Sequence, residues 1–475
     1  MPTTKHSTTA KTRPPTIRRR TRQAAPRAPE AANNAPQQRL SLEYLPIWEL
    51  LPHSKTLRKH SEQQLAAIMG SLRAFGLVTP LLVDANNVIV DGHAVLEAAK
   101  RLDFSEVPVV RLSQLSPAQI RACRVGLNKL AEGAAWDAKE LAFELFDIAP
   151  ALQAHDIEPE AIGFSPAEFD LLLAPQQTPP ADVMPGPATG PAVSRAGDLW
   201  LLGPHRLLCG DALNDGHFQQ LMAGEKARMS FTDPPYNLKV EGVISGLGKV
   251  KHREFAMASG EMTREQFTDF LATYMGNCAA HAVDGSVHFA CMDWRHIAEL
   301  LAAGDRAYNK LLNLVVWNKT NAGMGSMYRS QHELIGVFKA GTARHTNNFQ
   351  LGQTGRHRSN VWTVPGANSF GPNRTQDLAD HPTVKPTILV MEAIRDVSRR
   401  GEIVLDCFCG SGTTILAAER TGRVCRAIEL DPRYVDLAVH RWQALSGTAA
   451  VLHGDGRNFE ELAACRAAEG EHGHD

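Results

Sequence analysis

The heptapeptide TDPPYNL, Thr232–Leu238, brings a carboxylate, two prolines and an aromatic ring into one short segment. Pro234 and Pro235 have no backbone N–H, so this corner keeps its carbonyl acceptors and loses donors, and Asp233 adds a carboxylate acceptor. Acceptors around an NH2 group pull its hydrogens away from the nitrogen lone pair, which helps the amine to attack. Tyr236 offers a face for stacking a planar base. The cluster therefore predicts a binding site for an exocyclic amine on a planar ring.

A glycine-rich stretch, Glu402–Thr414 (EIVLDCFCGSGTT), predicts a second ligand-binding segment. A buried strand ends at Asp406, and the turn Gly410–Gly412 precedes an apolar helix. Open α/β sheets bind ligands at the carboxyl ends of their strands, and glycines let the backbone approach them closely. A later strand ends in Glu429, an acid suited to two ribose hydroxyls. The loop matches neither GxGxxG nor GKS/GKT, so a nucleoside without a pyrophosphate fits best.

Four motifs, in this order, resemble the amino-group DNA methyltransferases that use S-adenosylmethionine. They are DPPY (Asp233–Tyr236), HPTVKP (His381–Pro386), DCFCGSGTT (Asp406–Thr414) and IELDPRYVDLA (Ile428–Ala438). The catalytic motif precedes the cofactor loop, as in the permuted β class of that family. The resemblance covers about residues 195–445. It implies an α/β fold: a Rossmann-like open twisted sheet, largely parallel, with helices on both faces.

The same resemblance assigns roles to individual residues. It implies that the catalytic residues are Asp233, Pro234, Pro235 and Tyr236. S-adenosyl-L-methionine is the implied cofactor, with Glu429 on its ribose, Lys385 beside its carboxylate and Asp211 at its adenine ring; Asp455 competes weakly for that last role. The full implied cofactor set is Asp211, Thr232, His381, Lys385, Asp406, Phe408, Gly410, Ser411, Gly412, Thr413 and Glu429.

The first residue of the DPPY motif indicates the target base. Asp233 resembles the adenine N6 enzymes, whereas serine there more often marks cytosine N4 enzymes and NPPY occurs in protein and RNA methyltransferases. We therefore expect a site-specific, adenine-specific DNA methyltransferase that transfers the methyl group directly to N6 of an adenine flipped out of duplex DNA. The alternatives are N4-cytosine methylation, methylation of RNA or protein, and a ParB-like DNA-binding protein with an inactive methyltransferase body.

Two basic, weakly periodic segments are the expected DNA contacts. Residues 239–262 follow the catalytic cluster and predict a loop that closes on DNA. Residues 340–380 occupy the family's target-recognition region and are rich in Arg, Asn and Gln, which read base edges. Trp362 suits the core as well as it suits base stacking. The DNA-binding candidates are Lys249, Lys251, Arg253, Arg356 and Arg358.

Residues 40–130 resemble a ParB-like/sulfiredoxin-like domain, which implies a small α+β domain ahead of the methyltransferase. The matching features are GLVTPLLV and the DGH turn, Asp91–His93, before a helix. Ala94 and Val95 stand where that family usually has arginines, so we expect a degenerate DNA- or partner-binding module in which His93 is a candidate ligand contact. Fusions of this kind are typical of phage and mobile elements, which suggests a prophage.

Composition divides the chain into five parts. Residues 1–38 are basic and proline-rich, with one acid, and predict a disordered tail. Residues 39–173 form the ParB-like domain with a helical extension, and 174–194 form a proline-rich linker. Residues 195–447 form the methyltransferase domain, which opens with a hairpin at Gly203-Pro204. Residues 448–475 are expected to be a C-terminal tail.

Whole-chain composition sets limits on partners and location. The 475 residues carry a formal net charge of −1, so binding to double-stranded DNA depends on local patches. No apolar run is long enough for a membrane span, and no signal peptide is evident. Eight cysteines without paired CxxC motifs predict reduced thiols and no metal. We expect a cytoplasmic, nucleoid-associated bacterial or phage protein of a restriction-modification type, with a homodimer possible as in β-class relatives.

Overall fold

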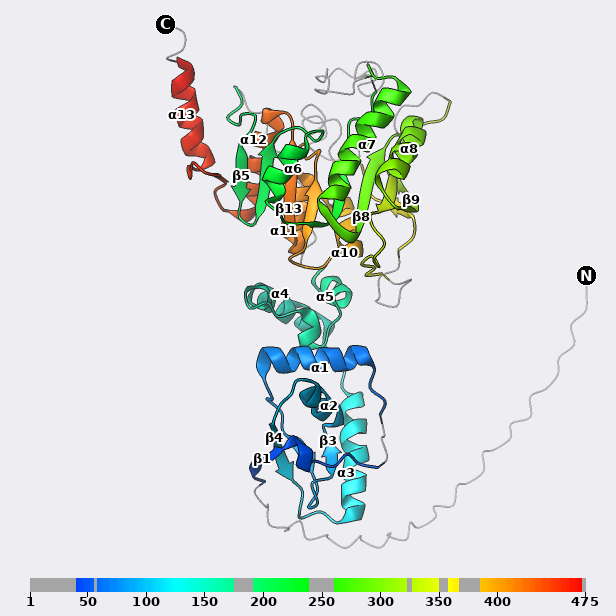
Figure 1. The fold of residues 1–475 in the computed structure, drawn as a ribbon, viewed down its shortest axis with the longest axis vertical. Helices are drawn as coiled ribbons and strands as arrows, with labels where there is room; N and C mark the ends of the chain where they lie inside the picture. Colours follow the sequence, from blue (N-terminus) through cyan, green and yellow to red (C-terminus); the bar gives the residue numbers. More distant parts are fainter. Residues whose placement is uncertain are drawn as a thin grey trace, which may run out of the picture.

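The computed structural model describes residues 40–54, 58–174, 191–238, 260–322, 327–349, 358–366 and 385–471. These residues form an N-terminal domain, a helical segment and a larger C-terminal domain (Figure 1). The predicted tail, 1–38, and residues 175–190 of the predicted linker, 174–194, lie outside the described residues.

The N-terminal domain is a small α+β unit, as its pattern predicts. Its sheet has the strand order β1-β4-β2-β3, with β2 parallel to β4 and the other pairs antiparallel. Apolar side chains of the sheet pack against helices α1 and α2 around buried Val83, Ile89 and Leu96. The elements are β1 (Leu42–Pro46), η1 (Ile47–Glu49), α1 (Glu62–Phe75), β2 (Leu81–Val83), β3 (Ile89–Asp91), α2 (His93–Arg101), β4 (Glu106–Arg111), α3 (Pro117–Leu130) and η2 (Ala131–Gly133).

Capping residues set the helix boundaries of this domain. Ser61 accepts a hydrogen bond from the Gln64 backbone at the start of α1, and Gly76 ends that helix with a positive φ. Ser116 and Gln119 form a capping box at the start of α3. The helical segment that follows lies between the two domains in Figure 1 and comprises α4 (Ala138–Ala154), η3 (Pro159–Ile162) and α5 (Pro166–Leu173).

Ten strands of the described residues form the sheet of the C-terminal domain, in the order β11-β9-β10-β8-β7-β12-β13-β6-β5-β14. The central run β8-β7-β12-β13-β6 is parallel, as predicted, but antiparallel strands at both sides make the sheet mixed. The strands are β5 (Leu199–Leu202), β6 (His205–Cys209), β7 (Ala227–Thr232), β8 (Ala282–Met292), β9 (Lys310–Asn318), β10 (His332–Lys339), β11 (Val361–Thr363), β12 (Ile403–Asp406), β13 (Val424–Glu429) and β14 (Val451–Leu452).

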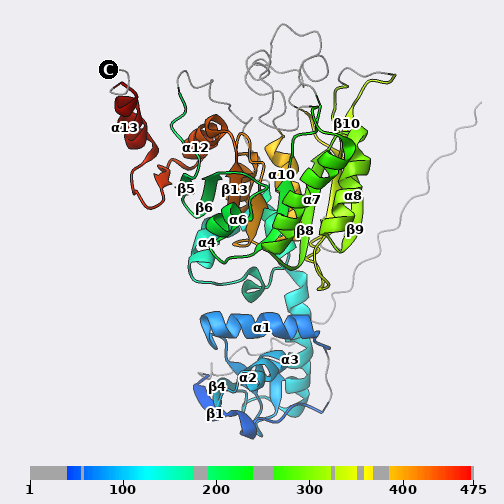
Figure 2. The same ribbon diagram turned by 45° about the horizontal axis from the view of Figure 1, so that its top comes forward.

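Helices cover both faces of this sheet (Figure 2). Successive side chains of a strand point to opposite faces of the sheet, and both faces of β12 are buried. Leu405 packs in one core cluster with α6, α7 and α8, and Val404 packs in another with α10. No helix of the described residues combines the length and apolar character needed to cross a membrane. The helices are α6 (Asp215–Met222), α7 (Arg264–Ala280), η6 (Trp294–His296), α8 (Ile297–Ala307), α10 (Thr387–Val397), α11 (Thr413–Thr421), α12 (Pro432–Ser446) and α13 (Phe459–Glu471).

The C-terminal residues differ from the expected tail. Val451 and Leu452 form β14, which pairs antiparallel with β5 at the sheet edge. Phe459 at the start of α13 is buried against Trp200, and Arg466 pairs with Asp198 through both guanidinium nitrogens. The domain therefore extends beyond residue 447. Without this segment, β5 would be an unpaired edge strand.

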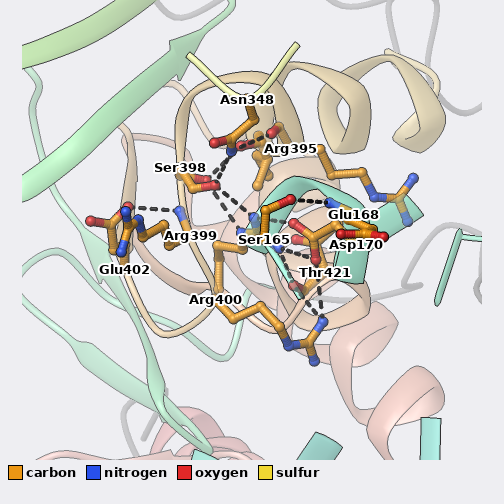
Figure 3. A network of polar contacts seen from close by, with 12 residues as sticks. Ser165, Glu168, Asp170, Asn348, Arg395, Ser398, Arg399, Arg400, Glu402 and Thr421 are labelled. Carbon is orange, nitrogen blue, oxygen red and sulfur yellow. Dashed lines mark hydrogen bonds and ion pairs between the residues drawn. The ribbon is translucent and has the colours of Figure 1, made fainter. Parts of the chain in front are cut away.

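The helical segment is joined to the C-terminal domain by a buried ion pair. Asp170 of α5 accepts two hydrogen bonds from the Arg423 guanidinium, at 3.0 and 2.6 Å, and Arg423 is 0% exposed. Arg423 also donates to the backbone of Ser398, whose carbonyl accepts from Asn348 as well. Figure 3 shows this network, in which Arg400 approaches the same carboxylate. The contact fixes α5 against the end of α10 and the start of β13.

Candidate active site

One cavity, of about 190 Å³, lies at the carboxyl ends of β7 and β12. These strands are parallel neighbours, so the two sequence motifs that follow them meet at one edge of the sheet. The pairing brings the Asp233 cluster and the glycine-rich loop to one cavity. The predicted residues that line the cavity are Asp233, Pro234, Pro235, Tyr236, Lys385, Asp406, Phe408, Gly410, Ser411, Thr413 and Glu429.

Asp233 belongs to a cluster of charged and polar groups on one side of the cavity. Its Oδ2 accepts from the Lys385 ammonium at 2.7 Å, and its Oδ1 accepts from the Tyr236 hydroxyl at 2.7 Å. Oε2 of Glu333 lies 3.0 Å from the same ammonium and 3.1 Å from the same hydroxyl. Lys319 pairs with the other oxygen of Glu333. Two carboxylates thus balance two ammonium groups.

Burial and charge pairing fix the protonation states of this cluster. Burial alone would raise the pKa of Glu333, but Lys385 and Lys319 outweigh it and hold that pKa at about 2. Burial opposes the charged form of Lys385, yet Asp233 and Glu333 raise its pKa above the ordinary lysine value. Burial, followed by the charge of Asp233, raises the pKa of Tyr236. At neutral pH the cluster therefore holds a carboxylate at Glu333, an ammonium at Lys385 and a neutral phenol.

Lys385 lines the cavity and pairs with two acids of the Asp233 cluster. Its ammonium contacts Asp233 and Glu333 and lies 5.4 Å from the centre of the Tyr236 ring. A buried ammonium requires opposite charges nearby, and these two carboxylates provide them. Glu333 and Lys319 were absent from the sequence prediction. The available signal was an acid directly before the apolar run Leu334–Phe338 of strand β10.

The cavity is also lined by a buried carboxylate that suits a cationic ligand. Asp406 ends β12, and burial raises its pKa to about 7 against the opposing hydrogen bonds from Thr414 and Phe408. The nearby carboxylates of Asp233 and Glu429 raise this pKa further. An ammonium or sulfonium ligand would supply a positive charge that favours the ionised form of Asp406. The carboxylate therefore fits the amino-acid part of S-adenosylmethionine.

Glu429 is held in a fixed orientation at the end of β13. Its Oε2 accepts from the Gly410 backbone at 2.7 Å, and its Oε1 accepts from the Asp431 backbone at 2.9 Å. Each carboxylate oxygen retains a further lone pair, so the group can still accept from two hydroxyls. Gly410 has a φ of +52°, and a Cβ there would meet no atom within 4 Å. This open space beside a fixed acceptor fits a ribose ring.

Gly412 holds the loop against α12, and replacing it should cost stability. Its φ is +84°, and an added Cβ would lie 2.8 Å from Cβ of Ala438. Gly401 has a φ of +78° with no atom near an added Cβ, so it is a matched control. We expect Gly412→Ala to destabilise the domain by about 1–3 kcal/mol more than Gly401→Ala, since both add backbone strain but only the first adds overlap. Urea unfolding measures the difference, and equal losses would contradict the account.

Three predicted cofactor residues do not line the cavity. Thr232 is buried at the end of β7, where its hydroxyl donates to the Phe289 carbonyl. Asp211 accepts from the Leu213 backbone, although its neighbours Gly210 and Ala212 line the cavity. Gly412 faces α12. The weak alternative, Asp455, pairs with Arg457 away from the site.

The described residues include one of the predicted DNA contacts. Lys249, Lys251, Arg253 and Arg356 lie outside them, as does His381 of the HPTVKP motif. Arg358 pairs with Asp396 and stacks on Trp362, its guanidinium carbon 4.6 Å from the ring centre. Trp362 belongs to the core, with 6% of its surface exposed. A role for Arg358 in DNA binding stays a prediction.

The DGH turn of the N-terminal domain lies beside a second hollow. Gly92 has a φ of +94°, and His93 begins α2. Arg58, His60 and Arg124 share the lining with His93. The buried arginine of this hollow is Arg124 of helix α3. The start of α2 has Ala94 and Val95 at the positions where the ParB-like family usually has arginines.

Comparison with known proteins finds DNA methyltransferases similar to the C-terminal domain. The model of the DNA methylase family (N6_N4_Mtase) matches residues 227–440. The type II methyltransferase M2.DpnII of Streptococcus pneumoniae is 26% identical over 239 residues, which cover 49% of this chain and 88% of that protein. In the structural comparison, the PvuII DNA methyltransferase (cytosine-N4-specific) is 14% identical with a TM-score of 0.40. The match covers 59% of this chain and 94% of that protein.

A separate relative matches the N-terminal domain. The ParB-like nuclease domain-containing protein YnaK of Escherichia coli (strain K12) is 37% identical over 82 residues, which cover 17% of this chain and 94% of that protein. The two matches account for different domains, in the order that the sequence motifs predict. Residues 227–440 therefore form an N6/N4 DNA methylase domain, and a ParB-like domain lies ahead of them.

Proposed function

We propose that this protein transfers a methyl group from S-adenosylmethionine to N6 of an adenine flipped out of duplex DNA. The observation that carries the proposal is the cavity that the Asp233 cluster and the glycine-rich loop line together. The DNA methylase family includes both N6 and N4 enzymes. Asp233 at the first motif position favours adenine over cytosine, by resemblance to the adenine enzymes.

S-adenosylmethionine supplies an electrophilic methyl group whose carbon–sulfur bond breaks as the new nitrogen–carbon bond forms. Asp406, Gly410 and Glu429 would hold its amino-acid and ribose parts. Asp233 would accept a hydrogen bond from the target amine, and the backbone carbonyls of the proline corner would accept another. These contacts orient the nitrogen lone pair and stabilise the positive charge that develops on nitrogen until a proton leaves.

The first test is methyl incorporation into different macromolecules. Unmodified plasmid DNA, total RNA and a protein extract are each incubated with the full chain and methyl-labelled S-adenosylmethionine. We expect label in the DNA alone. Label in RNA or protein without label in DNA would overturn the choice of substrate.

Cofactor affinity should depend on pH through Asp406. Below about pH 7 this carboxyl binds a proton in the folded protein, because burial has raised its pKa to about 7. A cationic ligand favours the carboxylate, so binding must release that proton and weakens as the pH falls. We expect affinity to drop roughly tenfold from about pH 7 to pH 5.5. Isothermal titration calorimetry measures the affinity for S-adenosylmethionine at each pH, and Asp406→Asn is the control that removes the titrating group. An affinity of the wild type that does not change with pH would contradict this prediction.

A further inference from the structure

Both oxygens of Asp233 already accept hydrogen bonds from the protein's own side chains. Tyr236 donates to one oxygen and Lys385 to the other, each at 2.7 Å. Each oxygen retains one further lone pair, so an amine entering the site either binds beside these donors or displaces one of them. A second acceptor for the displaced hydroxyl or ammonium therefore influences how readily Asp233 can bind the target amine.

Oε2 of Glu333 is placed to receive either donor. It lies 3.1 Å from the Tyr236 hydroxyl and 3.0 Å from the Lys385 ammonium, so each donor to Asp233 already has a second acceptor in reach. Tyr236 has one hydroxyl proton and can donate it to only one carboxylate at a time. Lys385 has three ammonium protons. It can break its hydrogen bond to Asp233 and keep its ion pair with Glu333, so it never lacks a counter-ion.

Glu333 itself is held firmly. It lies on β10, where its backbone is in register with Trp317 of β9. Lys319, at the end of β9, pairs with its second oxygen, and the Glu333 side chain is 15% exposed. The two lysines leave this carboxylate ionised at neutral pH. It is a fixed charge and not a mobile surface group.

We propose that Glu333 is a positioning residue that takes over the hydrogen bonds of Tyr236 and Lys385 when Asp233 engages the target amine. The inference rests on the proposed function, since it requires an amine at Asp233. Without Glu333, Lys385 would pair with Asp233 alone and compete with the substrate. Glu333 therefore affects the transfer step and not the binding of either substrate.

The test is Glu333→Gln, which keeps the size of the side chain and removes its charge. We expect the single-turnover rate of methyl transfer to fall roughly 100-fold, while the dissociation constants for S-adenosylmethionine and duplex DNA change less than threefold. Glu333→Asp keeps the charge on a shorter side chain and should recover part of the rate. Glu402→Gln is the matched control, because Glu402 pairs with Arg228 at the opposite end of the sheet; it should leave the rate unchanged.

The outcomes separate this inference from the proposed function. A wild type that does not methylate DNA would overturn both. An active wild type with a Glu333→Gln rate within threefold of it would overturn the positioning role alone. A loss confined to DNA or cofactor affinity, or an equal loss in Glu333→Asp, would also overturn it, because a purely structural role predicts that pattern. If Glu333→Gln does not fold, the rate of Glu333→Asp decides: an unchanged rate counts against the proposal and a reduced one with normal affinities supports it.

Discussion

Replacing Asp233 by alanine is expected to lower the rate of methyl transfer by about 10³-fold with little change in cofactor affinity. The carboxylate is the charged acceptor that the cavity offers to an amine beside the proline corner, and its removal also leaves Lys385 paired with Glu333. The cofactor contacts are proposed for other residues of the cavity, Asp406 and Glu429. The loss should therefore appear in the transfer step.

Single-turnover methylation of duplex DNA and calorimetry with S-adenosylmethionine check the two parts of this prediction. Asp233→Asn keeps one carbonyl acceptor and should lose less activity than the alanine variant. Asp215→Asn changes an exposed carboxylate of α6 that pairs with His281, and it serves as a control of equal charge change. Methyl transfer by Asp233→Ala at the wild-type rate would refute the assigned role.

Replacing Asp170 by alanine is expected to destabilise the C-terminal domain by about 3–5 kcal/mol. The reason is the partner that remains: Arg423 is 0% exposed and would keep an unpaired charge in the interior. Its remaining hydrogen bonds go to neutral groups, the carbonyls of Ser398 and Thr421 among them. Those groups do not replace a carboxylate that accepts two hydrogen bonds from the guanidinium.

Urea unfolding followed by tryptophan fluorescence measures this loss, since Trp200 and Trp442 are buried in the C-terminal domain. Glu160→Ala is the matched control at the same interface. Glu160 pairs with Arg399, which is 49% exposed, so this change should cost less than about 1 kcal/mol. Equal losses of unfolding free energy in the two variants would show that burial of the Asp170–Arg423 pair does not increase the cost of breaking it.

The parts of the site that follow directly on a strand could be predicted from the sequence. Asp233 comes immediately after β7 and Asp406 ends β12, so short motifs already combine strand, turn and functional side chain. Parallel neighbours then bring the two motifs to one edge. Glu429 was found for the same reason, as the last residue of β13.

Other contacts depend on pairings that the sequence does not specify. Glu333 reaches the cavity from β10, and Lys319 reaches Glu333 through the antiparallel pairing of β9 and β10. A shift of one residue in β10 would point Glu333 to the other face. Asp170 and Arg423 are joined only when α5 docks on the C-terminal domain. The two-residue strand β14 is too short to give a periodic pattern, which is why residues 448–475 were expected to be a tail.

The most direct test of the account is to identify the methylated nucleoside. Unmodified duplex DNA is incubated with the full chain and S-adenosylmethionine carrying a deuterated methyl group, digested to nucleosides and analysed by mass spectrometry. The account predicts deuterated N6-methyldeoxyadenosine with the wild type and at most traces with Asp233→Ala. Deuterated N4-methyldeoxycytidine in place of the adenine product, or no labelled nucleoside in the DNA, would contradict it.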